Sequence, residues 1–370
     1  MAASDPFWLA TPTRFASLKR GQARLALGLV VLLLLASLLA LFVPEPPALG
    51  AATGGARSQT DLMLYENIVA GVKGGGNYYA VAADALRAGS YPLRPFLTFR
   101  LPGLAVVLAA LPDEAPRYLL FLLVLCVAVT WAGRLKPVLP RLLPLLAFAI
   151  LLLGSLLAFF QSELAAFHEI WAGLLVAWSL ALRKPRRWVE AVAIGMAAML
   201  IRETAALYVI LMAGFAWREG ERREAYGWAA ALGLFAIAIG VHAYAVAGVT
   251  GPLDPASPGW AGLQGFGLFV KSLTLATALQ MLPLWAGALL VGLALLGWAS
   301  WDDPLAARMI GVVAAYAAVI AIFARLDTFY WGLMVAPVFL VGLVFVPDAL
   351  RDLVRQSLDR RRITVTRVTR

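Results

Sequence analysis

The chain has 370 residues, of which 62% are hydrophobic and 14% are charged, and its mean hydropathy is +0.83. These values exclude an ordinary soluble domain, in which roughly 45–50% of residues are apolar and about a quarter are charged. The net charge of +10 does not require a nucleic-acid partner, because Lys and Arg concentrate in the cytoplasmic loops of membrane proteins. We therefore expect no nucleic-acid binding. The single cysteine, Cys126, excludes an internal disulfide.

The first apolar segment, residues 25–43, follows Arg14, Lys19, Arg20 and Arg24, and this charge pattern predicts a cytoplasmic N-terminus. The segment is longer than the 7–15 apolar residues of a cleavable signal peptide, which predicts an uncleaved anchor. Nine further apolar segments predict an all-α polytopic membrane protein with about ten transmembrane helices. They lie near residues 115–133, 142–160, 165–182, 188–201, 204–217, 228–247, 272–298, 308–324 and 328–347.

Basic residues recur at the turns that this arrangement places on the inner side. By the positive-inside rule, they predict a multi-pass protein of the cell inner membrane with both termini in the cytoplasm. The expected parts are a cytoplasmic segment (1–24), a transmembrane domain (25–347) and a basic cytoplasmic tail (348–370). The basic residues of the inner turns are Arg134, Lys136, Arg141, Arg183, Lys184, Arg186, Arg187, Arg218, Arg222 and Arg223.

Residues 188–201 and 204–217 are too short to cross a bilayer core of about 30 Å upright, so they predict a hairpin of half-length helices. Arg202 and Glu203 fall at its tip. An ion at the bilayer centre costs about 2.5–3.5 kcal/mol, which places this pair at the outer interface, facing protein or water. Adjacent residues of a helix do not face each other, so we expect the two side chains to have different partners.

The longest outer loop, residues 44–101, predicts two interfacial helices. In "RSQTDLMLYENIVAGVKGG" apolar residues recur at helical spacing, which predicts the first helix. Ser58 with Asp61 resembles a capping box at its N-terminus, and Gly74–Gly76 predict its C-terminal end. "NYYAVAADALRAG" predicts a second helix that ends at Gly89.

Several segments resemble a bacterial multispanning branch of the GT-C superfamily of membrane glycosyltransferases: "GNYYAVAADALRAGSYPLRPFLTFRLP", "FHEIWAGLLVAWSL", "LIRETAAL" and "RLDTFYWGLMVAP". The resemblance covers most of the chain from residue 58 onward, and it includes an acidic residue in a long outer loop after the first span. It implies a GT-C-like fold and an active site on the outer face. Some members carry a paired acidic motif in this loop, whereas Asp61 is single, so we expect neither a metal ion nor another cofactor.

Ionisable residues from five separate places in the sequence fall on the predicted outer side. Asp61 is the candidate catalytic base, and the alternative is that it only caps its helix. For the others the alternatives are interfacial anchors, caps of spans and ties between helices. The candidate substrate-binding residues are Glu66, Tyr79, Arg94, Arg100, His168, Glu169, Arg202, Glu203, Arg325, Asp327 and Tyr330.

These residue types suit the transfer of a sugar from a polyprenyl-phosphate donor to a glycan or lipid acceptor among membrane lipids. A carboxylate accepts the proton of the attacking hydroxyl, and arginine stabilises the departing phosphate. The alternative is a transporter or flippase for an anionic lipid or sugar phosphate, which predicts polar residues continuing through the membrane. A third interpretation is a lipid-binding scaffold whose carboxylates only neutralise its arginines.

Overall fold

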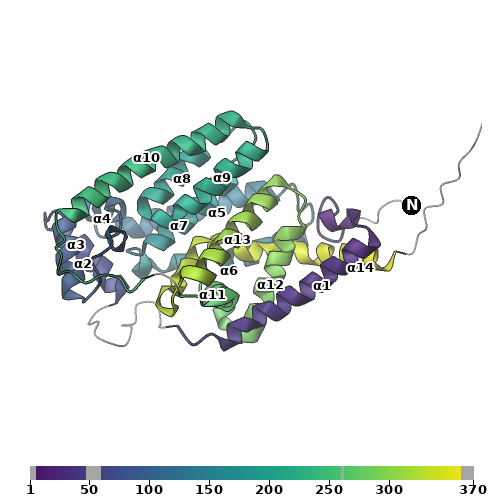
Figure 1. Cartoon of the computed structure of the whole chain (residues 1–370). Coiled ribbons are helices and arrows are strands. Elements are labelled where there is room, and N and C mark those ends of the chain that lie inside the picture. Colours follow the sequence, from purple (N-terminus) through teal and green to yellow (C-terminus); the bar gives the residue numbers. More distant parts are fainter. Residues whose placement is uncertain (1–5, 47–59, 260–261, 360–370) are drawn as a thin grey trace, which may run out of the picture.

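The computed structural model describes residues 6–46, 60–259 and 262–359, and within these ranges its regular elements are all helical (Figure 1). The predicted all-α class is confirmed. The α-helices are α1 (Arg20–Ser37), α2 (Asp61–Lys73), α3 (Tyr78–Ala88), α4 (Gly103–Ala110), α5 (Ala115–Leu135), α6 (Leu142–Leu156), α7 (His168–Leu182), α8 (Val189–Ile201), α9 (Ala206–Arg218), α10 (Arg222–Ala247), α11 (Gly265–Leu275), α12 (Leu284–Ser300), α13 (Pro304–Phe323) and α14 (Val346–Leu358).

Five helical segments of the described chain are long and apolar enough to cross a membrane, or six if one bent pair counts as a span. A membrane protein with several apolar helices is thereby supported, but the predicted count of about ten is not confirmed. Helices α7, α8, α11 and α12 have only 15, 13, 11 and 17 residues. The five segments are Arg20–Phe42, Ala115–Leu135, Leu142–Phe160, Arg222–Ala247 and Pro304–Phe323.

The predicted span at residues 272–298 is wrong as a continuous helix. Helix α11 ends at Leu275, and α12 begins at Leu284, directly after Pro283. Proline has no backbone N–H and disfavours a helical residue before it, so the helix cannot run through this position. The apolar run continues across the break, which is why hydropathy did not reveal it.

The predicted span at residues 328–347 is also wrong as one α-helix. It consists of two 3-10 segments, η8 (Leu326–Met334) and η9 (Ala336–Phe345), and a bend of 66° separates η8 from Ala336–Leu358. Pro337 lies in the first turn of η9, where a missing N–H is tolerated, and it could not continue a helix from η8. Because of this bend, the axis of η8 is not collinear with the axis of η9 and α14.

The predicted short helices around Arg202 are confirmed as α8 and α9, with one 3-10 turn, η6 (Glu203–Ala205), between them. Both pack along α10, and Figure 1 shows the three lying side by side. Arg202 is completely buried, so neighbouring segments cover the tip of this pair.

Helices α2 and α3 bury their apolar faces in a cluster distinct from the main core, to which α4 adds Ala105, whereas Leu104 and Leu108 of α4 belong to the main core. We call α2, α3 and α4 together the α2–α4 unit. The Thr60 hydroxyl caps α2 by accepting the N–H of Met63 at 3.1 Å, and Asn77 caps α3. The helices end at Gly74 and Gly89, as predicted. Ser58, the predicted capping residue, lies outside the described residues.

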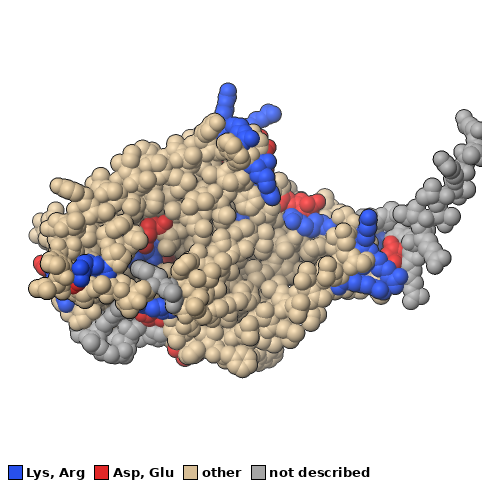
Figure 2. All heavy atoms as spheres, viewed as in Figure 1, with Lys and Arg blue, Asp and Glu red and all other residues tan. Residues whose placement is uncertain are grey.

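Charged side chains gather at two ends of the face seen in Figure 2, with a broad uncharged surface between them. Exposed leucines line α1, where Leu25, Leu29, Leu32 and Leu35 have 56–67% of their surface exposed. Contiguous apolar exposure of this kind fits contact with lipid. The sides of the membrane that the two ends face stay a prediction.

The described parts of both termini pack against each other at one end of the molecule. Buried Asp348 on α14 accepts the backbone N–H groups of Phe7, Trp8 and Leu9 at 2.6–3.0 Å. The nearby Asp352 accepts both the N–H and the hydroxyl of Thr13. The predicted tail therefore begins as a packed helix, while its residues 360–370 lie outside the described chain.

Candidate functional site

The α2–α4 unit, the segment around residues 91–100 and η8 enclose a cavity of about 100 Å³, which we call the Asp61 pocket. Apolar residues of α2, α3 and α4 form much of its wall. This volume holds a few water molecules. Its polar and aromatic lining residues include Asp61, Tyr65, Tyr78, Tyr91, Arg100, His168, Ser257, Arg325, Asp327, Tyr330 and Trp331.

Asp61 is the first residue of α2, directly after the capping Thr60. Its two carboxylate oxygens accept separate hydrogen bonds, one from the Tyr91 hydroxyl at 2.8 Å and one from the Tyr330 hydroxyl at 3.0 Å. An ionised carboxylate has about four lone-pair sites, so each oxygen keeps one for a further donor. Tyr330 comes from η8, so this contact joins two segments that are 269 residues apart.

Arg100 reaches the pocket with its guanidinium held from two sides. Its Nε donates to the Tyr65 hydroxyl at 3.1 Å, and its Nη1 donates to Glu203 at 3.2 Å. Burial raises the pKa of Tyr65 to about 12, so this phenol stays protonated at neutral pH. A guanidinium has five N–H donors, and these contacts use two of them. Arg100 can therefore bind an anion without leaving its partners.

Behind Arg100 lies an ion pair that exposes no surface. Arg202 Nε is 2.6 Å from Glu169 Oε1, and both side chains are 0% exposed. Arg202 also contacts Glu203, which in turn accepts from Arg100. The expectation that Arg202 and Glu203 have different partners is therefore only half right. Arg202 is extended backbone rather than helix, so the helical rule that kept adjacent side chains apart does not apply.

Arg325 and Asp327 line the pocket as a two-contact pair. Arg325 donates from Nε and Nη2 to the two oxygens of Asp327, each at 3.1 Å. The backbone N–H of Arg325 donates to the Thr328 hydroxyl at the start of η8. Arg325 is about one-third exposed, and this pairing leaves its remaining donors available to the pocket.

His168 opens α7 and lines the pocket while only 3% of its surface is exposed. Its ring packs edge-on against Tyr65, with centroids 4.9 Å apart. Neither ring nitrogen has a hydrogen-bond partner among the described residues. A buried polar group without a partner costs about 1–3 kcal/mol, so a ligand or water that bonds to His168 would recover this loss.

Three of the predicted substrate-binding residues lie elsewhere. Glu66 faces a second hollow on the other side of α2. The Tyr79 hydroxyl is 3.2 Å from Nδ1 of His242 on α10. Exposed Arg94 donates to the backbone oxygen of Asp254. The other candidates line the Asp61 pocket or, as with Glu169, Arg202 and Glu203, form the ion-pair network behind it.

Sequence reasoning missed two tyrosines that hold the pocket's charged groups. Tyr65 follows Asp61 by one helical turn and was interpreted only as part of the apolar face. Tyr91 lies in the proline-rich stretch "SYPLRPF" and was not among the candidate site residues, although its hydroxyl donates to Asp61. The spacing of Tyr65 was a usable signal, whereas the contact of Tyr91 with Asp61 depends on how the chain folds after Gly89.

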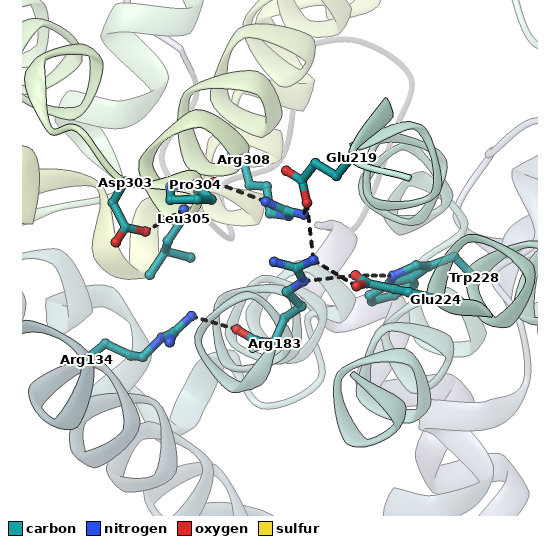
Figure 3. Close-up of polar contacts among 9 residues, drawn as sticks. All are labelled: Arg134, Arg183, Glu219, Glu224, Trp228, Asp303, Pro304, Leu305 and Arg308. Atoms are coloured by element: carbon teal, nitrogen blue, oxygen red, sulfur yellow. Dashed lines mark hydrogen bonds and ion pairs between the residues drawn. The ribbon is translucent and has the colours of Figure 1, made fainter. Parts of the chain in front are cut away.

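A separate ion network lies at the opposite end of α7, about 20 Å from His168 by the rise of a 15-residue helix. Arg183 donates to Glu224 at 2.8 and 2.9 Å and to Glu219 at 3.3 Å, and Figure 3 shows these side chains facing one another. Arg308 on α13 donates to the same oxygen of Glu219, and Trp228 donates to Glu224. These contacts tie α7, α10 and α13 together.

Between the two ends, a hollow beside α7, α13 and η9 has a volume of only about 10 Å³. Its lining is apolar, and includes Val176, Leu180, Met309 and Val338. On α7, the Ser179 hydroxyl forms a hydrogen bond of 2.7 Å with the Tyr208 hydroxyl.

The described ranges contain no group of three or more His, Cys, Asp and Glu side chains arranged to hold a metal ion. No family model, curated protein or solved structure matches this chain. The GT-C resemblance therefore remains an expectation from the sequence motifs, and the function is argued from the site.

Proposed function

We propose that this protein is an inverting membrane glycosyltransferase that moves a sugar from a polyprenyl-phosphate donor to a hydroxyl of a glycan or lipid acceptor. The observation that supports this most directly is the position of Asp61. Its carboxylate, held by two tyrosine hydroxyls, shares one pocket with guanidinium groups from the segment before α4 and from η8. A carboxylate base beside phosphate-binding donors is the arrangement that this transfer requires.

In the proposed step, the acceptor hydroxyl attacks the anomeric carbon of the donor sugar and gives its proton to Asp61. The bond between the anomeric carbon and the phosphate oxygen breaks, and its electron pair leaves with the polyprenyl phosphate. Arg100 and Arg325 stabilise that anion through N–H donors that their carboxylate partners do not use. His168 donates to an oxygen of the donor, which satisfies its buried ring.

A sugar phosphate is larger than the cavity of about 100 Å³. Donor binding in this proposal therefore moves α2 and α3 relative to η8. These two helices share an apolar cluster distinct from the main core, so in this proposal they shift together. Such a shift breaks the contact between Tyr330 and Asp61 and frees one carboxylate oxygen for the acceptor hydroxyl.

The transporter alternative is less well supported. It requires polar groups or a passage between the Asp61 pocket and the network around Arg183. The hollow between them is small and apolar. We further propose that the pocket faces outward at the inner membrane and that both termini are cytoplasmic, following the charge pattern of the predicted turns.

The test is transfer from a radiolabelled polyprenyl-phosphate sugar by the purified Asp61→Asn variant. Loss of a general base lowers the rate by about 10²–10⁴-fold, and we expect a loss in that range. The control is Asp84→Asn on α3, the same change at a side chain that is 82% exposed. Undiminished transfer by folded Asp61→Asn protein would exclude Asp61 as the base.

A further inference from the structure

A second hollow lies on the side of α2 away from the Asp61 pocket, and we call it the Glu66 hollow. Its volume is about 460 Å³, within the range of sites for small ligands. It lies among α2, the chain between α4 and α5, and the segment before α7. Unlike the Asp61 pocket, it admits a sugar-sized molecule without any movement of the helices.

The Glu66 hollow is acidic. Four carboxylates and two basic side chains line it. Both basic side chains already have acidic partners, because Lys73 contacts Asp113 and Arg117 lies 3.9 Å from Glu114. Glu66 has no ion-pair partner among the described residues, and Glu163 contacts only the hydroxyl of its neighbour Ser162. Two carboxylates are therefore available to a ligand, and no unpaired cation is available to an anion.

The two cavities share a wall made of Val69, Leu108 and Ala166, which line both of them. These three side chains are apolar and uncharged. A molecule in the Glu66 hollow therefore lies one side-chain layer from the pocket that contains Asp61. Arg100 and Arg325 line the Asp61 side of this wall, whereas the unpaired carboxylates Glu66 and Glu163 line the other side, where the one arginine among the lining residues, Arg117, is paired with Glu114.

We propose that the Glu66 hollow binds the acceptor, a hydroxyl-bearing molecule without negative charge, and that it prefers a cationic sugar such as an amino-pyranose. The inference rests on the proposed function, because it places the anionic donor on the arginine side and the acceptor on the carboxylate side. Carboxylates bind sugar hydroxyls and ammonium groups as hydrogen-bond acceptors, and they repel phosphate. Val69 of the shared wall is on α2, so the shift of α2 that admits the donor also opens this wall and lets the acceptor hydroxyl reach Asp61.

The first experiment measures the charge of the hollow. In a Cys126→Ala background, Ser162→Cys places a thiol in its lining, and Ala88→Cys on α3 is the exposed control. We compare the reaction rates of a cationic and an anionic methanethiosulfonate reagent at each site. Relative to the control, the cationic reagent should be favoured roughly tenfold, the size that Coulomb's law gives for two net charges about 10 Å away in water. Equal ratios at the two sites would overturn the proposal.

The second experiment uses three pyranose probes to protect the Ser162→Cys thiol: glucosamine, glucose and glucose 6-phosphate. We expect protection in that order, with none from the phosphate, and loss of protection when Glu66→Gln and Glu163→Gln are combined. The matched control is Glu190→Gln at the start of α8, an exposed carboxylate outside the hollow. Equal protection by all three probes, or protection that survives the double substitution, would refute the assignment.

The outcome also separates this inference from the proposed function. Asp61→Asn should abolish transfer but leave protection by glucosamine intact. If transfer depends on Asp61 while no probe protects the thiol, the acceptor site is wrong and the glycosyltransferase proposal stands. If protection holds but no variant affects transfer, the hollow is an amino-sugar site and the proposed catalytic role of Asp61 fails.

Discussion

The buried ion pair between Glu169 and Arg202 gives a prediction whose size follows from the structure. Glu169→Gln keeps the shape of the side chain and removes one charge from a site that is 0% exposed. Removal of one partner from a buried pair costs about 3–5 kcal/mol, because the other charge stays buried without compensation. Arg202 keeps its contact with Glu203, so we expect a loss of unfolding free energy near the lower limit, about 3 kcal/mol.

The assay is thermal unfolding of the purified protein in detergent. With an unfolding entropy of about 2.1 cal/mol/K per residue, a loss of about 3 kcal/mol lowers the Tm of a chain of this length by about 4 °C. The control is Asp113→Asn, which removes a carboxylate from the exposed pair with Lys73, where the side chains are 90% and 40% exposed. Exposed pairs contribute about 0–1 kcal/mol, so its Tm should fall by about 1 °C or less.

The double substitution of Glu169 and Arg202 by leucine provides the internal check. It removes both charges, so it should be less destabilising than either single replacement. If Glu169→Gln unfolds within a degree of Asp113→Asn, water reaches Arg202 and the reasoning from complete burial is refuted.

Two further predictions concern packing and pH. A Cβ at Gly297 would lie 1.8 Å from the backbone oxygen of Gly342, so Gly297→Ala should lower the free energy of unfolding by about 1–3 kcal/mol in the same assay. The control is Gly133→Ala, whose new Cβ meets no atom within 4 Å and which should be neutral or stabilising. Equal effects of the two substitutions would contradict the close approach of α12 and η9. The hydrogen bond from Arg87 lowers the pKa of Asp254 from 3.8 to about 2, so this pair supports the docking of its loop above pH 4 and the support is lost as the pH falls through 2. A carboxyl ¹³C titration should give that midpoint, and Arg87→Gln should return it toward 3.8; an unchanged midpoint would exclude this cause.

Local signals predicted α2, α3 and the short helices α8 and α9 well, whereas α4 (Gly103–Ala110) was not predicted. The caps and stops of α2 and α3 depend on neighbouring residues, so Asn77, Gly74 and Gly89 could be interpreted from sequence. The breaks at Pro283 and beside Pro337 were not predicted, because hydropathy sums over a window and both prolines lie within apolar runs. Two of the ten predicted spans contain these breaks, which contributes to the count of about ten not being confirmed.

The composition and the spacing of polar residues determined by themselves that the chain is helical, apolar and suited to a membrane, and that its ionisable residues fall in a few short stretches. Only the tertiary structure decided which of these residues meet. It brings Asp61 to Tyr330 across 269 residues and turns Glu66 away into a different hollow, although both residues are on α2. The physical reason is that hydropathy and helical periodicity act within one segment, whereas the partner of a buried charge is chosen by the packing of segments that are distant in sequence.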